Sequence, residues 1–530
     1  MIKTKVKLPF NYTQADLTEA LVRELPIERS EIKSLGILKR TLNISDRENI
    51  HYDAVLSASF SPEREAGLLK MKKKVSLSPD LTLDITASSL PCRPVVIGAG
   101  PAGLFAALLL AEAGARPIIY ERGLAVEERG KKVNLFHTLG ILDPECNVQY
   151  GEGGAGTYSD GKLKLGALDK YNYKVLSEFV NAGAPEEILF ATGAHLGTDK
   201  LPIIVKNIRE KIISLGGEFH FGARLTDLKI KDGRVLGGTV VQNGSQVEFE
   251  AEEVILATGH SAHDVFELLR RSGVHLESRG FGIGLRIEHP REYIDELVYG
   301  KNAPDNIGTA SYHLVTHLEN GRSVYSFCMC PGGTVVPAAS EQGGVVTNGM
   351  SEYARMADNS NAAFLVSVTP SDFGSDDVLA GIALQRRIER LAFIRAGETY
   401  KAPATTMSAF MKKETKTSYT SLKPSYALGT EDIAPEEYLP EFVTDSLRAA
   451  IPDFDGWMHG FYYPDAVLTG PETRTTSPIR VSRNDSFESL TVKGLYPAGE
   501  GAGYSGGIIS SARDGLMIAE KILLKHKKDN

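Results

Sequence analysis

The sequence predicts an α/β protein in which helices cover both faces of a parallel β-sheet. Val95 to Ile97 is a short apolar strand, residues 101–114 form a helix rich in alanine and leucine, and Pro117 to Tyr120 is a second buried strand. A strand, a helix and a strand in this order form a βαβ unit, which belongs to a parallel sheet buried on both faces. Because 530 residues exceed one ordinary core, we expect two or three domains.

Residues 1–90 are predicted to form a small α+β domain. Residues 2–8 alternate apolar and polar side chains as a half-buried strand does, residues 15–24 have helical spacing, and 37–44 and 51–60 have the pattern of further strands. This order favours a ferredoxin-like module. No catalytic cluster is evident in it, so we expect it to serve in docking or shielding.

The first strand of the βαβ unit runs into a glycine-rich turn, GAGPAG at 98–103. In this GxGxxG pattern, the first two glycines allow a tight turn and a close approach to a pyrophosphate, and the third lets the helix pack against the sheet. The helix N-terminus offers amide groups to the phosphates. The carboxylate of Glu121, at the end of the second strand, is expected to bind the adenosine ribose. This Rossmann-like site is predicted to comprise Gly98, Gly100, Pro101, Ala102, Gly103, Glu121 and Arg122.

A second GxGxxG occurs at Gly501, Gly503 and Gly506, again after a strand and before a helix. An NAD-binding unit needs another strand and an acidic residue after that helix, and the sequence ends at Asn530 without room for them. We therefore interpret this stretch as the C-terminal flavin segment of an FAD enzyme. Its strand delivers an acid to the ribityl or pyrophosphate region and its helix points at the isoalloxazine. The predicted contacts are Gly499, Glu500, Gly506, Gly507 and Ile508.

Two further segments agree with an FAD site. Residues 253–259, EVILATG, form an apolar strand that ends in a turn at Thr258 and Gly259. The loop GEGGAGTYSDGKL at 151–163 is dense in glycine, so its amides can lie against a pyrophosphate or flavin; a plain surface loop is the alternative. From this loop we predict contacts by Gly153, Gly154 and Thr157. Arg129 and Lys131 are candidates for phosphate contact or for an exposed helix face.

Seven motifs connect the chain to a known family: GEGGAGTYSDGKL at 151–163, LATGHSAHDVFELL at 256–269, GIGLRIEHP at 282–290, CMCPGGTVVPA at 328–338, TNGMS at 347–351, ETRTTSPIR at 472–480 and PAGEGAGYSGGI at 497–508. With these motifs the sequence resembles flavoproteins of glutathione-reductase type, and most closely the uncharacterised FAD-dependent dehydrogenases with an FAD-dependent C-terminal domain. The resemblance covers nearly the whole chain. It implies bound FAD but no settled substrate.

Few side chains are expected to act in catalysis, because a flavin itself carries the hydride. Arg474 is a candidate for holding a carboxylate or carbonyl substrate; an ion pair with Glu472 or another acid is the alternative. His260 is a candidate proton donor or a structural hydrogen-bonding group. Arg286 and Glu288 either face the pocket or form a cross-strand pair.

Two pairs of residues suggest other chemistry. Cys328 and Cys330 suggest a thiol relay beside the flavin. They lie on an apparent strand, however, and not on a helix close after the first GxGxxG motif (residues 98–103, the fingerprint), where a reductase relay is expected. His313 and His317 lack a third ligand nearby, so no metal site is expected.

These assignments predict four segments along the chain: the N-terminal domain at 1–90, the first part of the FAD domain at 91–262, a substrate or cap domain at 263–470 with a long helix near 377–396, and the second part of the FAD domain at 471–530. The leading function is an FAD-dependent dehydrogenase or reductase of a small or isoprenoid-like substrate. NAD(P)H is a possible transient co-substrate. The alternatives are an FAD monooxygenase and a non-catalytic, redox-sensing flavoprotein.

Composition limits the partners. Lys and Arg total 59 against 67 for Asp and Glu, a formal net charge of −8, which gives no broad basic surface for nucleic acid. No apolar stretch reaches the length of a membrane span. Four cysteines do not make a secreted disulfide framework, so a reducing cytoplasm is expected. A small-molecule substrate is the expected partner, and the sequence predicts no oligomeric state.

Overall fold

The computed structural model describes residues 1–527 except 165, 167 and 416. It divides into two compact units. The first comprises Met1–Asp84, Lys162–His195 and Tyr299–Gly308, and the second comprises Ile85–Gly161, Leu196–Val298 and Thr309–Asn530. No helix in the described part of the chain is long and apolar enough to cross a membrane.

The N-terminal unit is a ferredoxin-like fold, as predicted. Its antiparallel sheet has the order β2-β3-β1-β4. Ile2, Val6 and Leu8 of β1 are buried against Leu17 and Leu21 of α1, as the alternating pattern predicts. The elements are β1 (Ile2–Pro9), α1 (Gln14–Glu24), β2 (Ser34–Asn43), β3 (His51–Ser59), α2 (Pro62–Leu68) and β4 (Val75–Leu77).

Two of these elements, α2 and β4, were not predicted. The signal was present: Ser61 caps the helix by accepting a hydrogen bond from the Arg64 amide, and Pro62 occupies its first turn. The same unit holds α5 (Lys170–Asn181), whose cap is Asp169, and the short helix Glu186–Leu189. The Arg40 amide of β2 donates to the Phe190 carbonyl over 2.7 Å, which joins this segment to the edge of the sheet.

The second unit contains the predicted parallel sheet. In the described residues it has five strands in the order β23-β11-β5-β6-β7, and every neighbouring pair is parallel. The C-terminal strand thus completes the sheet that begins with the fingerprint strand, as predicted for a discontinuous FAD domain. The strands are β5 (Val95–Ile97), β6 (Ile118–Glu121), β7 (Glu218–Phe221), β11 (Val254–Leu256) and β23 (Leu495–Pro497).

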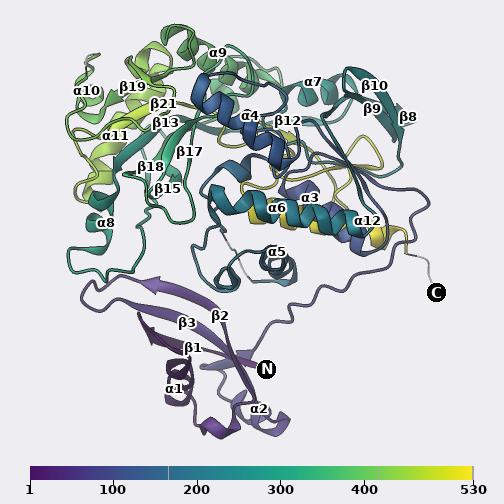
Figure 1. Cartoon of the computed structure of the whole chain (residues 1–530), viewed down its shortest axis with the longest axis vertical. Helices are drawn as coiled ribbons and strands as arrows, with labels where there is room; N and C mark the ends of the chain where they lie inside the picture. The colour runs from purple at the N-terminus through teal and green to yellow at the C-terminus, as the bar shows by residue number, and fades with distance from the viewer. Residues whose placement is uncertain (165, 167, 416, 528–530) are drawn as a thin grey trace. The chain divides into compact units, whose positions relative to one another are not determined.

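Helices α3 (Pro101–Glu112), α6 (Gly197–Ser214) and α12 (Ile508–Lys525) lie side by side in this unit, as Figure 1 shows. Residues 102–111 of α3 are all buried, which accounts for the longest apolar stretch of the sequence. Gly515 of α12 allows the closest approach: a Cβ there would lie 2.0 Å from the Ala102 carbonyl oxygen of α3. The two glycine-rich turns are therefore followed by helices in direct contact.

Shorter elements surround this sheet. The strands β8, β9 and β10 form an antiparallel meander that leads back to β11. The elements are α4 (Val126–Leu139), the short helix η2 (Ala155–Tyr158), β8 (Ala223–Lys231), β9 (Arg234–Gln242), β10 (Ser245–Glu250) and α7 (His263–Arg271).

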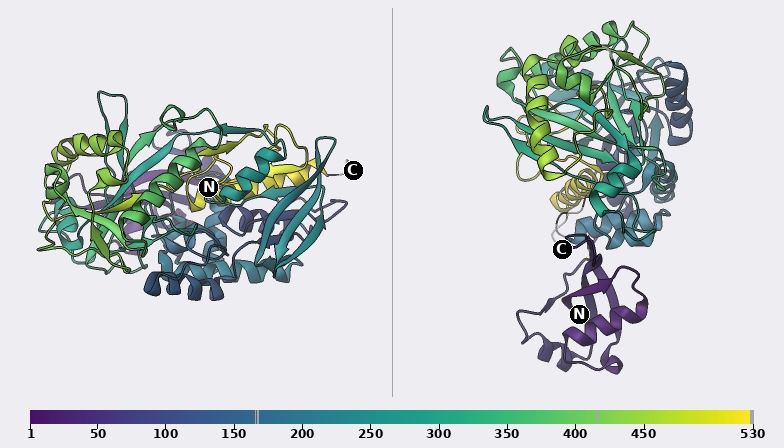
Figure 2. Two further views of the ribbon diagram at one scale, coloured as in Figure 1. Left: turned by 90° about the horizontal axis from the view of Figure 1, so that it is seen from above. Right: turned by 90° about the vertical axis from the view of Figure 1, so that its left-hand side faces the viewer.

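The inserted region is built on a second sheet with the order β14-β15-β18-β13-β21-β19-β20 in the described residues. The central strand β13 is buried along Phe281 to His289, because elements cover both of its faces. Figure 2 shows green helices lying against this sheet, among them α11. The chain enters and leaves the insertion through β12 and β22, which pair antiparallel.

The elements of the insertion are β12 (Leu276–Ser278), β13 (Phe281–Pro290), α8 (Arg291–Tyr299), β14 (Val315–His317), β15 (Ser323–Cys330), β16 (Thr334–Pro337), β17 (Thr347–Met350), β18 (Asn359–Val368), α9 (Ala380–Arg395), β19 (Ala402–Thr406), α10 (Met407–Lys412), β20 (Thr430–Asp432), α11 (Glu441–Trp457), β21 (Val467–Glu472) and β22 (Ile479–Val481).

Candidate flavin site

The fingerprint turn is crowded by main chain at two of its glycines and open at the third. A Cβ at Gly98 would lie 2.3 Å from the Ala257 carbonyl oxygen, and a Cβ at Gly103 would lie 1.9 Å from the Gly98 oxygen. At Gly100 the nearest atom is the Gly154 Cα, 3.7 Å away. The turn thus packs tightly on the protein side and leaves room at Gly100, where the predicted pyrophosphate would lie.

Glu121 joins this turn to the neighbouring loops. Its Oε2 accepts a hydrogen bond from the Ala99 amide over 2.8 Å, and its Oε1 accepts from the amides of Gly123 over 2.8 Å and Gly151 over 3.0 Å. The side chain is buried. A carboxylate has about four lone-pair sites, so one further donor, such as the predicted ribose hydroxyl, can still be accepted.

Arg129 does not hold the position predicted for it. The guanidinium is buried and donates to five main-chain oxygens of one loop, those of Asn147, Val148, Gly151, Glu152 and Gly154, over 2.6 to 3.2 Å. It is neither a phosphate ligand nor part of an exposed helix face. Its role is to fold residues 147–154 into the loop that faces the fingerprint turn.

The glycine-rich loop carries two buried oxygen atoms without a hydrogen-bond partner among the described residues. They are Oε1 of Glu152 and Oγ1 of Thr157. The other Glu152 oxygen accepts from the Val126 amide over 2.8 Å and from Arg209 over 2.6 Å. Burial raises the pKa of Glu152 to about 7. Unpaired buried polar atoms are costly, so these two oxygens fit a ligand that supplies hydroxyl groups, as the ribityl and ribose parts of FAD do.

Gly153 and Gly154 fit this loop for steric reasons. Gly153 has a φ of +85°, and a Cβ there would lie 2.1 Å from Thr157 Oγ1. At Gly154 a Cβ would lie 3.0 Å from the Gly100 Cα. The loop and the fingerprint turn therefore approach each other through glycines.

The C-terminal glycine turn lies against the turn that ends β11. A Cβ at Gly501 would lie 2.4 Å from the Gly259 carbonyl oxygen, whereas no heavy atom of the described residues lies within 4 Å of a Cβ built at Gly259 or at Gly506. Thr258 of the same β11 turn is half-buried. At Gly507, before α12, the nearest atom is Ser510 Oγ at 4.0 Å. These open glycines at the N-terminus of an 18-residue helix leave space for a ligand, and the helix dipole favours negative charge there.

Gly499 and Glu500 lie in this turn. Asp514 and Arg483 contribute to the same turn, and the sequence analysis did not predict a role for either. Burial raises the pKa of Glu500 to about 8. The Gly499 amide donates to Asp514 of α12 over 2.8 Å, and Asp514 pairs with Arg483 over 2.6 Å. Asp514 fixes the turn that presents Glu500. Its only sequence signal is an acidic residue on an otherwise apolar helix face.

Arg474 is a structural ion-pair partner and not a substrate ligand. Its Nε and Nη2 donate to Oε1 and Oε2 of Glu389 over 2.7 and 2.8 Å, and both side chains are buried. The structure therefore shows the alternative role, an ion pair with an acid, and the acid is Glu389 of α9. Glu472 pairs elsewhere.

His260 is buried close to this ion pair. Burial, together with the nearby charges of Arg474 and His263, lowers the pKa of His260 to about 3. This direction favours the neutral ring, and the role of His260 as a proton donor stays a prediction. Its Nδ1 lies 3.2 Å from Ser261 Oγ, which is a structural contact.

Arg286 and Arg122 also each form ion pairs with carboxylates. Arg286 lies 3.2 Å from Glu472 on the adjacent strand β21, which is the cross-strand alternative. Glu288 is a separate group and accepts from Asn359 over 2.7 Å. Arg122 pairs with Glu145 over 2.9 Å and with Asp264 over 3.0 Å.

Arg122 also lines a cavity of about 610 Å³. The cavity lies between the end of β6 and the α9 region of the insertion. Its charged lining residues, such as Glu341 and Arg386, pair with one another over 2.7 Å. The Arg122 guanidinium lies 4.0 Å from the centre of the Tyr150 ring, at the ribose end of the predicted FAD path.

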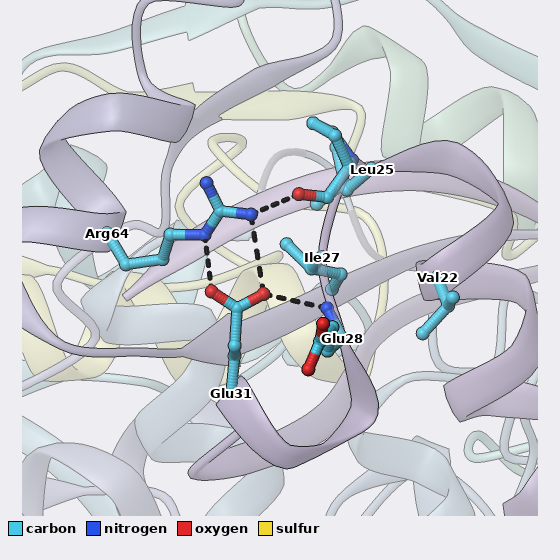
Figure 3. A pocket seen from close by; sticks show the side chains of 7 residues that line it. Val22, Leu25, Ile27, Glu28, Glu31 and Arg64 are labelled. Carbon is cyan, nitrogen blue, oxygen red and sulfur yellow. Dashed lines mark hydrogen bonds and ion pairs between the residues drawn. The ribbon is translucent and has the colours of Figure 1, made fainter.

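A further hollow, of about 700 Å³, lies in the N-terminal unit (Figure 3). Its charged residues are engaged with one another: Arg64 Nε lies 2.7 Å from Glu31 Oε1, and the Glu28 amide donates to Glu31 Oε2 over 2.7 Å. The remaining lining is apolar, from Val22, Leu25, Pro26 and Ile27. Its lining residues include none of those predicted to bind FAD.

Comparison with known proteins gives the family. Residues 280–475 match the model of a domain described as FAD-dependent protein, C-terminal domain-like, and residues 189–283 match the FAD binding domain. A Clostridium beijerinckii protein of uncharacterised function is 43% identical over 516 residues, which is 96% of each chain. The chain belongs to this family of FAD-dependent proteins. It is a flavoprotein of the FAD-dependent oxidoreductase class, with FAD as its cofactor.

Solved structures with partial likeness include two dehydrogenases. The 3-ketosteroid-Δ4-(5α)-dehydrogenase of Rhodococcus jostii RHA1 is 13% identical, with a TM-score of 0.35 over 86% of this chain and 100% of that chain. A flavoprotein/dehydrogenase of Cytophaga hutchinsonii is 13% identical, with a TM-score of 0.36 over 82% of this chain and 80% of that chain.

Proposed function

We propose that the protein is a dehydrogenase or reductase that passes hydride between a small organic substrate and bound FAD, with NAD(P)H as a transient donor. The observation that carries this proposal is the position of the second glycine motif. It follows β23, which pairs with β11, which in turn pairs with the fingerprint strand β5. Both glycine turns therefore serve one dinucleotide. A nicotinamide donor would reach the flavin by docking and not through a second Rossmann unit within the described residues.

The flavin supplies the hydride chemistry when bound, so the protein has to orient it and adjust its charge. Glycines 98, 100 and 103 would hold the pyrophosphate at the start of α3. Glu152 Oε1 and Thr157 Oγ1, which have no hydrogen-bond partner among the described residues, would receive hydroxyl groups. The amides at Gly507 to Ile509 would favour negative charge on the ring when it is reduced, because they open an 18-residue helix.

The substrate is proposed to be neutral, either a carbonyl compound or an apolar, isoprenoid-like molecule. Three buried arginines that could otherwise bind an anionic substrate each face a carboxylate already. Arg286 pairs with Glu472 over 3.2 Å and Arg474 with Glu389 over 2.7 Å, and Arg355 Nε donates to Asp160 over 2.8 Å. Removing a buried arginine from its carboxylate to bind a substrate would leave that carboxylate uncompensated.

Anaerobic reduction of the purified holoprotein tests this proposal. NADH, NADPH and a panel of neutral carbonyl and polyprenyl compounds would be mixed with the protein while flavin absorbance is followed. Bleaching by a nicotinamide donor, reversed by one class of organic acceptor with formation of reduced product, is the expected result. The Gly100→Ala variant, predicted to lack flavin, is the matched control for reduction that bypasses the site.

Two other results would replace the proposal. Oxygen uptake coupled to NAD(P)H oxidation, with a hydroxylated product, would make the protein a monooxygenase. A flavin that can be reduced chemically but turns over with no donor and acceptor pair would make it a redox-sensing protein without catalysis.

A further inference from the structure

The sheet of the N-terminal unit packs against helices on one face. The even-numbered residues of β1, from Ile2 to Leu8, are all buried, and the apolar ones lie in a core shared with α1 and α2. Side chains alternate along a strand, so the odd-numbered residues project from the opposite face. These residues are lysines: Lys5 and Lys7 are exposed, and Lys3 is half-buried. Three lysines therefore stand in a row, about 6.6 Å apart, on the face opposite the helices.

The pairing of the strands brings a fourth lysine to this face. Val55 of β3 pairs with Lys5 of β1 on one side and with Lys39 of β2 on the other. Residues directly opposite one another in a sheet project from the same face, so Lys39, which is exposed, lies beside the row. Ser57, which pairs with Lys3, is a second short side chain between the strands. We call this surface the lysine face, and its lysines are Lys3, Lys5, Lys7 and Lys39.

The positive charge of the lysine face is not neutralised by ion pairs. None of its four ammonium groups forms an ion pair with a described residue. Asp53 shares the face and pairs in register with Lys7, but its Oδ2 accepts a hydrogen bond from Asn43 over 2.7 Å. Residues 1–84 contain 14 Lys and Arg against 12 Asp and Glu, so they are net positive in a chain of net charge −8. Like charges at neighbouring positions of a sheet repel, so an anionic partner would stabilise this face.

The aromatic side chains of the sheet lie on its other face. Tyr52 of β3 pairs with Leu8, on the side that the helices cover, and its ring stacks on Phe10 with 5.7 Å between the centroids. The Arg40 guanidinium lies 4.7 Å from the centre of the Tyr52 ring. Single-stranded nucleic acid binds a sheet face through aromatic side chains on which its bases stack, and the side chains placed on the lysine face are not aromatic. The lysine face therefore favours carboxylates over bases.

The carboxylates of a protein can match the lysines in spacing. Acidic side chains two apart on a strand, or three to four apart on a helix, lie about 5–7 Å from one another, close to the separation of the lysines along β1. We propose that the lysine face docks an acidic segment of a partner protein. Because the ammonium groups are exposed point charges, this docking is fast, reversible and sensitive to salt. The inference goes beyond the proposed function, since it depends on neither FAD nor a substrate.

Binding of an acidic peptide to the holoprotein tests this proposal. A fluorescein-labelled oligoglutamate peptide would be titrated with the full-length protein, at low and at physiological salt, while anisotropy is followed. The wild type is expected to bind it, and Lys5→Glu/Lys7→Glu to bind it about tenfold more weakly. Lys72→Glu/Lys73→Glu makes the same charge change between α2 and β4, outside the lysine face, and should bind within about twofold of the wild type. No binding by the wild type, or equal losses in the two variants, would overturn the proposal.

Further measurements separate this occupant from others. A length-matched oligouridylate should bind more weakly than the peptide, and equal or tighter binding would assign the lysine face to nucleic acid. In sedimentation velocity, a wild-type dimer that Lys5→Glu/Lys7→Glu dissociates would assign the face to a second copy of this chain. Either result overturns the proposal. Lys5→Gln/Lys7→Gln adds no negative charge and serves as a second variant; it should show an intermediate loss of peptide binding, with a urea midpoint equal to that of the wild type. Wild-type affinity in that variant would also overturn the proposal.

Discussion

The fingerprint end and the insertion of the second unit achieve precise geometry in different ways. At the glycine turn 98–103, main chain packs directly against main chain. A Cβ built at Gly103 would lie only 1.9 Å from the Gly98 carbonyl oxygen. In the insertion, buried side chains meet: Arg474 with Glu389 and Arg286 with Glu472, while Arg355 pairs with Asp160 of the glycine-rich loop. The first geometry depends on the absence of side chains and the second on charges that balance each other.

This difference determines what each region tolerates. A methyl group added at a crowded glycine has to displace backbone, which is shared by the strand and the helix of the turn. A side chain removed from an ion pair leaves a buried charge, but the cost can be recovered by removing its partner as well. The predictions below test these two behaviours.

The largest effect is expected for Gly103→Ala. Its Cβ would overlap the Gly98 carbonyl oxygen, so we expect the apoprotein to lose about 5 kcal/mol of unfolding free energy and to retain no flavin. The matched Gly100→Ala variant has room for its Cβ and should unfold within about 1 kcal/mol of the wild type. It should nevertheless lose flavin. Urea denaturation and the visible spectrum measure both effects; a Gly100→Ala protein with full flavin content would show that the pyrophosphate does not lie there.

Arg474→Met should cost about 3–5 kcal/mol, because it leaves the Glu389 carboxylate buried without its partner. The double variant Arg474→Met/Glu389→Met should recover most of that loss and keep its flavin. Urea denaturation of the four proteins in this double-mutant cycle gives the coupling. If Arg474→Met instead keeps its stability and loses only substrate turnover, Arg474 contacts the substrate.

Arg129→Met should destabilise the protein by about 3 kcal/mol, since the carbonyl oxygens of loop 147–154 lose a charged donor. Flavin affinity should fall with it, because that loop faces the fingerprint. Arg270→Met is the control, and its loss should be under about 1 kcal/mol because Arg270 and its partner Asp377 are both exposed. Fluorescence titration with FAD measures the affinity. Equal effects of the two substitutions would contradict the assigned role of Arg129.

A further prediction concerns pH. The pKa of Glu500 is raised to about 8 in the folded protein, so between about pH 4.5 and 8 the unfolded chain has released a proton that the folded chain keeps. Stability of the apoprotein should therefore fall as pH rises through this window. Glu500→Gln should remove that fall and be more stable than the wild type by about 5 kcal/mol at pH 8.5, with little difference at pH 4.

Urea denaturation of the apoproteins at both pH values measures the effect. Glu128→Gln, on the exposed face of α4, is the control and should leave the pH profile unchanged. Parallel profiles for Glu500→Gln and wild type would show that Glu500 is ionised in the folded protein.

Local patterns were enough to predict the scaffold. The strands 95–97 and 117–120 and the helix 101–114 were predicted within two residues of their observed ends, and the strand predicted before the second glycine motif is observed as β23. Each depends on neighbours in sequence: apolar runs, glycine at a turn and a proline in the first turn of a helix. The second helix of the N-terminal unit was missed, although its Ser-Pro start is a local signal of the same kind.

The sequence by itself therefore determined the parallel sheet and its two glycine turns, because those features follow from short-range sterics and periodicity. Only the tertiary structure decided that Arg129 folds a loop, that Arg474 pairs with Glu389, and that β15 bulges between Phe327 and Cys330. Arg474 and its partner lie 85 positions apart in the chain. The charge state and reach of such side chains depend on which distant groups are buried beside them, and no local pattern encodes that.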